Sequence, residues 1–259
     1  MEDLLPLLPI SQAVLWTGFV VFMRVSAMMA VLPAFGDQPV PMRLRLALAL
    51  MFTLIVAPAV APTIGPMPDG LLPSAAVLGP EVVAGLLFGI FLRFFILALQ
   101  IAGSIAAQST SLSQIFGGTA GGDPQPAIGH VLVVAGTALA AVLGLHVQAA
   151  SYMFLSYDMV PFGVAVVPDV VLRLGLQEVT RCFALGFTLS APFLIASLIY
   201  NVILGVINRA MPQLMVSFVG APAITAGGLF LLLLTAPVIL SVWMMDFSAF
   251  MEMPYRAWP

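Results

Sequence analysis

The chain has 259 residues, of which 62% are hydrophobic and 7% are charged, and its net charge is −3. Ordinary globular proteins carry about 25% charged residues, so this composition excludes a soluble globular domain and predicts an integral membrane protein. The small net charge gives no sign of a nucleic-acid partner. The single cysteine, Cys182, excludes a disulfide framework and a cysteine-cluster metal site.

Six apolar segments approach the roughly 20 residues that a helix needs to cross a bilayer. In chain order they are residues 11–32, 44–61, 80–105, 128–155, 179–200 and 224–245, and residues 203–219 are long enough for a further half-span. We therefore predict an all-α integral membrane protein with about six long hydrophobic helices, some of them broken or kinked. The whole chain, 1–259, is expected to form a single membrane-embedded domain.

Charged residues lie inside several of these segments. A charge at the bilayer centre costs about 2.5–3.5 kcal/mol, so such side chains are expected to face protein or water. Glu81 and Arg93 in the third segment are about 18 Å apart along one helix and cannot pair with each other. Each is expected to find a partner on another helix or subunit. We favour a structural ion pair over a proton path, because a relay usually adds a second carboxylate or histidine nearby. The charged residues concerned are Arg24, Glu81, Arg93, Arg181 and Asp246.

Residues 108–126, QSTSLSQIFGGTAGGDPQP, interrupt the apolar sequence between the third and fourth segments. Glycine pairs permit backbone angles that no helix uses, and Pro124 and Pro126 disfavour helix in the residues before them. Non-helical backbone at membrane depth is tolerated only where it is buried in protein or lines a water-filled space. The stretch is therefore predicted to be a loop or broken helix that the rest of the chain holds.

Small residues recur at four-residue spacing in the third and fourth segments, which predicts close helix packing. These residues are Gly85 and Gly89, then Gly136, Ala140 and Gly144. A second polar interruption, residues 208–213, contains Pro212, which is expected to kink or end a helix. Two interpretations of residues 208–213 stay open: a polar contact with another subunit, and an ordinary interhelical loop.

The motifs of common enzymes are missing from the sequence. There is no P-loop, no HExxH and no GxSxG with a matching histidine. His130 and His146 are too far apart on one predicted helix for a metal-ligand pair at i and i+4. The sequence therefore predicts no enzymatic activity, no cofactor and no metal site.

Several stretches taken in order resemble a known family. Near the N-terminus the matching stretches are residues 22–34 (FMRVSAMMAVLPA) and 40–46 (VPMRLRL). In the third segment they are residues 81–85 (EVVAG), Gly89, Leu92-Arg93 and Ala102-Gly103. Gly144-Leu145-His146 comes next, and the most specific match runs from Asn201 through Asn208-Arg209 and Pro212-Gln213 to residues 218–222 (FVGAP). Together they resemble the FliR family of flagellar export-gate subunits, and more distantly the equivalent subunits of virulence type III secretion.

The resemblance implies one subunit of a helical multi-subunit gate in the bacterial inner (cytoplasmic) membrane, at the flagellar basal body. Its implied partners are FliP-type and FliQ-type subunits, other membrane components of the export apparatus, membrane lipid and unfolded export substrates. Residues 1–155 correspond to a FliP-like part, and residues 179–259 to a FliQ-like helical hairpin.

The resemblance also implies that residues 109–126 form a plug loop in the channel, although their two glycine pairs depart from the family pattern. The implied plug residues are Leu112, Ile115, Phe116, Gly117, Gly118, Gly121 and Gly122. Candidate subunit contacts are Arg24, Arg43, Arg45, Glu81, Arg93, Asn208, Arg209, Pro212 and Gln213. The rival hypotheses are a virulence-system gate subunit, a secondary transporter with a broken-helix substrate site, and an assembly scaffold that lines no pore.

Overall fold

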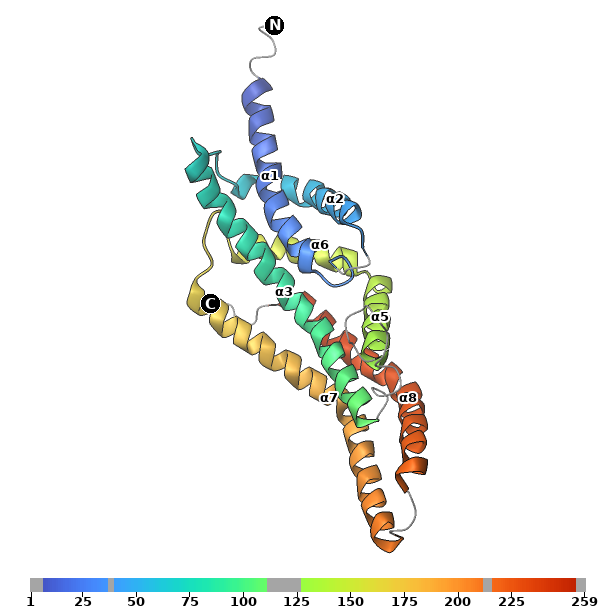
Figure 1. Ribbon diagram of the computed structural model, residues 1–259. Coiled ribbons are helices and arrows are strands. Elements are labelled where there is room, and N and C mark those ends of the chain that lie inside the picture. Colours follow the sequence, from blue (N-terminus) through green and yellow to red (C-terminus); the bar gives the residue numbers. More distant parts are fainter. Residues whose placement is uncertain (1–6, 37–39, 111–126, 212–215, 255–259) are drawn as a thin grey trace. The chain divides into compact units, whose positions relative to one another are not determined.

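The computed structural model describes residues 7–36, 40–110, 127–211 and 216–254, and every regular element in these ranges is a helix (Figure 1). Five of these helices are long and apolar enough to cross a membrane, and the bent pair α5 and α6 could form a sixth span. This confirms the predicted all-α membrane protein with about six long helices. The elements are α1 (Leu7–Val31), α2 (Met42–Val60), the 3-10 helix η2 (Ala61–Thr63), α3 (Leu71–Ser109), α5 (Ala127–Val142), α6 (Leu145–Met159), α7 (Pro168–Ala210) and α8 (Val216–Glu252).

The predicted separation of residues 179–200 from a half-span beginning at residue 203 is wrong. Helix α7 is continuous over 43 residues and ends at Ala210. Asn201 does not interrupt it, because its amide nitrogen donates to the Ser197 carbonyl oxygen one turn earlier, at 2.9 Å. A side-chain amide that bonds to its own helix in this way leaves the backbone hydrogen bonds in place.

The fourth predicted segment, residues 128–155, is two helices. The chain breaks between α5 and α6 at Gly144, which has a φ of +86°. Glycine adopts this left-handed conformation without the steric cost that a Cβ atom brings. An added Cβ at Gly144 would have no atom within 4 Å, so this glycine marks a break and not a close helix contact. Its assignment to the packing series with Gly136 and Ala140 is therefore corrected.

The chain folds into two compact units, each built from segments far apart in the sequence. The first unit comprises Met1–Arg93, Leu143–Glu178 and Met251–Pro259, and the second comprises Phe94–Val142 and Val179–Phe250. Helices α3, α7 and α8 each contribute residues to both units. The division into a FliP-like part and a FliQ-like part stays a prediction.

In the first unit, α1 packs against α2, and α2 packs against α6. Buried residues recur every three or four positions along α1, as expected for one side of a helix. Gly85 of α3 lies so close to α1 that an added Cβ would meet the carbonyl oxygen of Arg24. The Phe88 ring of α3 packs edge-on against Tyr152 of α6, with ring centroids 6.0 Å apart. The buried side chains described in α1 are Trp16, Val20, Val21, Arg24, Val25, Met28 and Met29, and Leu32 just after the helix is buried too.

In the second unit, aromatic side chains of α3 and α8 form the centre of the core. The Trp243 and Phe247 rings are stacked with centroids 5.3 Å apart, and Phe95 packs edge-on against Phe247 at the same centroid distance. Trp243 Nε1 donates to the Phe95 carbonyl oxygen at 2.8 Å, so the buried indole N–H is satisfied. Gly136 of α5 leaves room for Leu99 and Trp243, which confirms its predicted packing role.

Candidate functional site

A buried ion pair lies at the centre of the first unit. Arg24, in the middle of α1, is 1% exposed, and Glu81 of α3 is 0% exposed. Arg24 Nε donates to Glu81 Oε2 at 2.8 Å, and Nη2 donates to Oε1 at 3.1 Å. This two-bond geometry is the strongest form of an arginine–carboxylate pair. The prediction that Glu81 pairs outside its own helix is confirmed, since its partner belongs to α1.

The same two side chains also fix the end of α6. Arg24 Nη1 donates to the carbonyl oxygens of Ser156 at 2.8 Å and Val160 at 2.9 Å. The Ser156 carbonyl also accepts the N–H of Val160 at 3.1 Å, so the guanidinium adds a second donor there and gives a donor to the Val160 carbonyl just past the end of α6. Glu81 Oε1 accepts the N–H of Gly163 at 3.1 Å, and the Tyr157 ring lies 3.8 Å from the guanidinium carbon. The pair therefore connects α1 and α3 to the turn that follows α6.

Sequence reasoning identified the charges of this network but missed the other members. Tyr157 is one aromatic residue among many, and the Ser156 and Val160 carbonyls are backbone groups that any residue type supplies. No sequence pattern marks them, because they meet Arg24 only through folding. The contacts of Arg24 and Glu81 described above lie within one unit of the chain. A subunit-contact role for these two residues stays a prediction.

A second ion pair joins α7 to α8 in the second unit. Arg181 Nη2 donates to Asp246 Oδ1 at 2.6 Å, and Nε donates to Oδ2 at 3.2 Å. Both side chains are about one-third exposed. The guanidinium carbon lies 5.1 Å from the centroid of the Phe95 ring and 5.4 Å from that of Phe250. Both charges thus face protein groups, as expected for intramembrane charges.

The predicted plug residues, Leu112 to Gly122, lie outside the described residues, but both flanks of the segment are placed. Gly103 of α3 and Gly129 of α5 are in such close contact that a Cβ added at Gly103 would meet the Gly129 backbone. Thr110, just after α3, is 3% exposed, and it packs where a side chain at Gly228 of α8 would lie. The end of α3 and the start of α5 are therefore held side by side.

The remaining candidate contact residues lie toward the surface of the chain. Asn208 and Arg209 are exposed in the last turn of α7, and Arg43 is exposed in the first turn of α2. Arg45 and Arg93 are partly exposed, whereas Pro212 and Gln213 lie outside the described residues. Their proposed contacts with other subunits stay predictions.

Comparison with known proteins gives one consistent family. Residues 15–250 match the family model described as bacterial export proteins, family 1. The chain is 36% identical over 230 residues to the flagellar biosynthetic protein FliR of Caulobacter vibrioides, an alignment that covers 88% of this chain and 91% of the relative. It is 24% identical to FliR of Escherichia coli over 84% of this chain and 83% of the relative. It is 27% identical to FliR of Aquifex aeolicus over 88% of each chain.

The matched region includes α2, α3, α5, α6 and α7 completely, together with the ion pair Arg24–Glu81 and the polar turn at Asn208 and Arg209. The helical architecture agrees with a protein that crosses a membrane several times. This chain belongs to family 1 of the bacterial export proteins, in the FliR group of flagellar biosynthetic proteins.

Proposed function

We propose that the chain is an export-gate subunit of the flagellar type III secretion apparatus and forms part of the channel for unfolded export substrates. The observation that carries this proposal is the family match over residues 15–250, with FliR relatives along most of the chain. The proposed location is the bacterial inner membrane at the flagellar basal body, beside FliP-type and FliQ-type subunits. The proposed role is structural and not enzymatic.

The surface of the second unit supports a partner-covered position. The C-terminal half of α7 exposes apolar side chains on several sides, with Leu198 66% exposed, Val202 60% and Val206 65%. Exposed apolar surface of this extent marks contact with lipid or with another protein. Asn201, Asn208 and Arg209 lie on the same exposed half of the helix, and polar groups of this kind favour a protein neighbour over lipid alone.

The flanks of residues 111–126 support a plug role for that segment. The chain leaves the described part at Thr110 and re-enters it at Ala127, where α3 and α5 are packed through Gly103 and Gly129. A segment whose two ends are fixed together can be displaced without separating the helices that carry it. Leu112, Ile115 and Phe116 are its candidate sealing residues, and its glycine pairs are candidate hinges.

We expect deletion of residues 114–122 to make membranes that contain the assembled gate leaky to small ions, because the candidate seal is removed. The measurement is ion flux across inverted membrane vesicles from cells that express the complete apparatus. In a control variant, a glycine-serine linker of the same length replaces residues 114–122. This variant separates loss of length from loss of side chains. Unchanged leakage in an assembled gate lacking these residues would contradict the plug role.

Arg209→Ala is expected to leave folding intact and to reduce co-purification of the other gate subunits. Arg209 is exposed, so its removal should change the free energy of unfolding by less than about 0.5 kcal/mol. Arg173→Ala is the matched control, because Arg173 is an exposed arginine of the same helix. Equal recovery of partners with both variants would show that Arg209 is not a subunit contact.

A further inference from the structure

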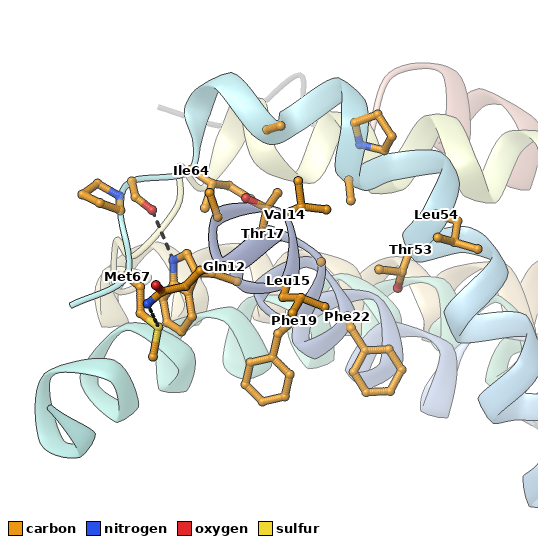
Figure 2. A pocket seen from close by; sticks show the side chains of 18 of the residues that line it. Gln12, Val14, Leu15, Thr17, Phe19, Phe22, Thr53, Leu54, Ile64 and Met67 are labelled. Carbon is orange, nitrogen blue, oxygen red and sulfur yellow. Dashed lines mark hydrogen bonds between the residues drawn. The ribbon is translucent and has the colours of Figure 1, made fainter. Parts of the chain in front are cut away.

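An apolar groove lies in the first unit, between α1 and the chain from α2 to Met67. Its volume is about 1230 Å³, and Figure 2 shows side chains of α1, including Leu15 and Phe19, along it. Leu15 is 73% exposed and Leu54 is 75% exposed. Both helices that form the groove are long and apolar enough to cross a membrane. An open apolar surface of this kind needs an apolar occupant.

The two ends of the groove differ in polarity. At one end, Gln12 Nε2 donates to Met67 Sδ at 3.7 Å, and Trp16 Nε1 donates to the Gly65 carbonyl oxygen at 3.2 Å (Figure 2). Trp16 is itself 6% exposed, and a buried indole N–H of this kind usually has an acceptor. At the other end, the Thr53 hydroxyl donates to the Ala49 carbonyl oxygen within α2, at 2.7 Å. The groove therefore has one polar end and an apolar body.

The length of the groove corresponds to one leaflet of a bilayer. From Gln12 to Phe22, the limits of its lining on α1, ten residues at 1.5 Å each span about 15 Å. The hydrocarbon core of a bilayer is about 30 Å thick, so the groove covers half of it. Beyond Phe22, α1 turns its Arg24 and Val25 side chains into the core of the unit. A spanning helix of another subunit would extend past the groove, whereas an acyl chain would end there.

We propose that this groove binds an acyl chain of a phospholipid, with the headgroup at the Gln12–Met67 end. Among the residues that the structure describes, those lining the groove carry no charge, which suits a hydrocarbon chain. The charged residue that follows Met67 along the chain is the exposed Asp69, and none of the described residues that line this end is basic. Charge complementarity thus favours a zwitterionic headgroup with an amine, as in phosphatidylethanolamine, over an anionic headgroup. The site depends on the membrane location of α1 and α2 and not on a role in export.

Photo-crosslinking tests this site in the full-length chain. The protein, purified with its co-purifying subunits, is placed in nanodiscs containing phosphatidylethanolamine whose acyl chain carries a diazirine. Irradiation should label Leu15, Phe19 and Leu54 in preference to Met51 and Ile55, which are exposed on α2 but do not line the groove. Unlabelled phosphatidylethanolamine should compete for the groove residues first. Equal labelling of all these exposed residues would indicate bulk lipid and would overturn the proposal.

Gly18 offers a direct way to block the groove. It lines the groove, and an added Cβ would have no atom within 4 Å, so Gly18→Leu fills the space without a backbone clash. Labelling of the groove should fall by roughly tenfold or more, the discrimination that one misplaced methylene group gives in an apolar pocket. Gly79→Leu is the matched control, because Gly79 is equally open but does not line the groove. Ala57→Leu blocks the groove from α2 and guards against misfolding of a single variant.

Three further outcomes would overturn the proposal. Unchanged labelling in both blocking variants would show that the lipid does not lie in the groove. Labelling in the isolated chain that disappears in the assembled complex would assign the groove to a helix of a partner subunit. Stronger labelling by a diazirine phosphatidylglycerol would contradict the headgroup assignment.

Discussion

Glu81→Leu is expected to lower the free energy of unfolding by about 3–5 kcal/mol, the cost of leaving one charge of a buried ion pair uncompensated. The variant leaves the Arg24 guanidinium, 1% exposed, without its carboxylate and deprives the Gly163 N–H of its acceptor. Arg24→Met should have an effect of similar size, because it leaves the buried Glu81 carboxylate without its cationic partner. Equilibrium unfolding in mixed micelles measures both, and a motility assay reports the consequence in cells.

The double variant Arg24→Met, Glu81→Leu separates charge from packing. Replacing both members of a buried ion pair with apolar residues of similar volume is often neutral, so the double variant should recover most of the stability that each single variant loses. Arg173→Met is the control, because its ion pair with Asp169 is exposed and contributes about 0.5 kcal/mol or less. A double variant no more stable than Glu81→Leu would show that the pair contributes more than mutual charge compensation.

Gly103→Ala and Gly129→Ala are expected to differ strongly although they belong to the same contact. A Cβ at Gly103 would meet the Gly129 backbone, which cannot move aside without separating α3 from α5. A Cβ at Gly129 would meet atoms no closer than 3.6 Å, an ordinary van der Waals distance. Overpacking of a core costs about 1–3 kcal/mol, whereas Gly129→Ala, in the first turn of α5, should stabilise the helix by less than the roughly 0.5–1 kcal/mol that alanine gains over glycine in a helix interior.

Gly103 and Gly129 flank the segment 111–126, so Gly103→Ala should also impair export. The measurements are equilibrium unfolding in micelles and secretion of flagellar substrates into the medium. Gly129→Ala serves as the control, because it changes the same residue type at the same contact. Equal stability and equal secretion by the two variants would contradict the close approach of α3 and α5.

The apolar composition and the length of the apolar segments were sufficient to predict the helical class, because a continuous apolar stretch of about 20 residues can satisfy its own backbone in a membrane by forming a helix. The positions of the long helices followed from hydropathy, and the intramembrane charges pointed to a buried pair. Hydropathy did not show which face of each helix is buried. Helix α1 is apolar on nearly all sides, so its buried face, from Trp16 to Met29, has no periodic contrast in the sequence.

Gly144 and the segment boundary near residue 200 illustrate two local errors. Gly144 fitted a four-residue series of small residues, yet its positive φ ends α5, and a dihedral angle is not visible in a residue spacing. The predicted separation of residues 179–200 from residues 203–219 failed because α7 is continuous from Pro168 to Ala210, and the Asn201 amide between them bonds to the Ser197 carbonyl of the same helix. In both cases the residue pattern permits more than one local geometry, and the sequence alone does not show which one the chain adopts.

The sequence by itself determined that this is an all-α membrane protein, and its ordered motifs indicated the FliR family. Only the tertiary structure decided that Arg24 pairs with Glu81 and binds the end of α6, since these groups are 57 and 132 residues apart in the chain. The same holds for the groove between α1 and α2, whose lining residues become neighbours only after folding. Hydropathy acts on each segment separately, whereas an ion pair or a groove depends on how segments pack against one another.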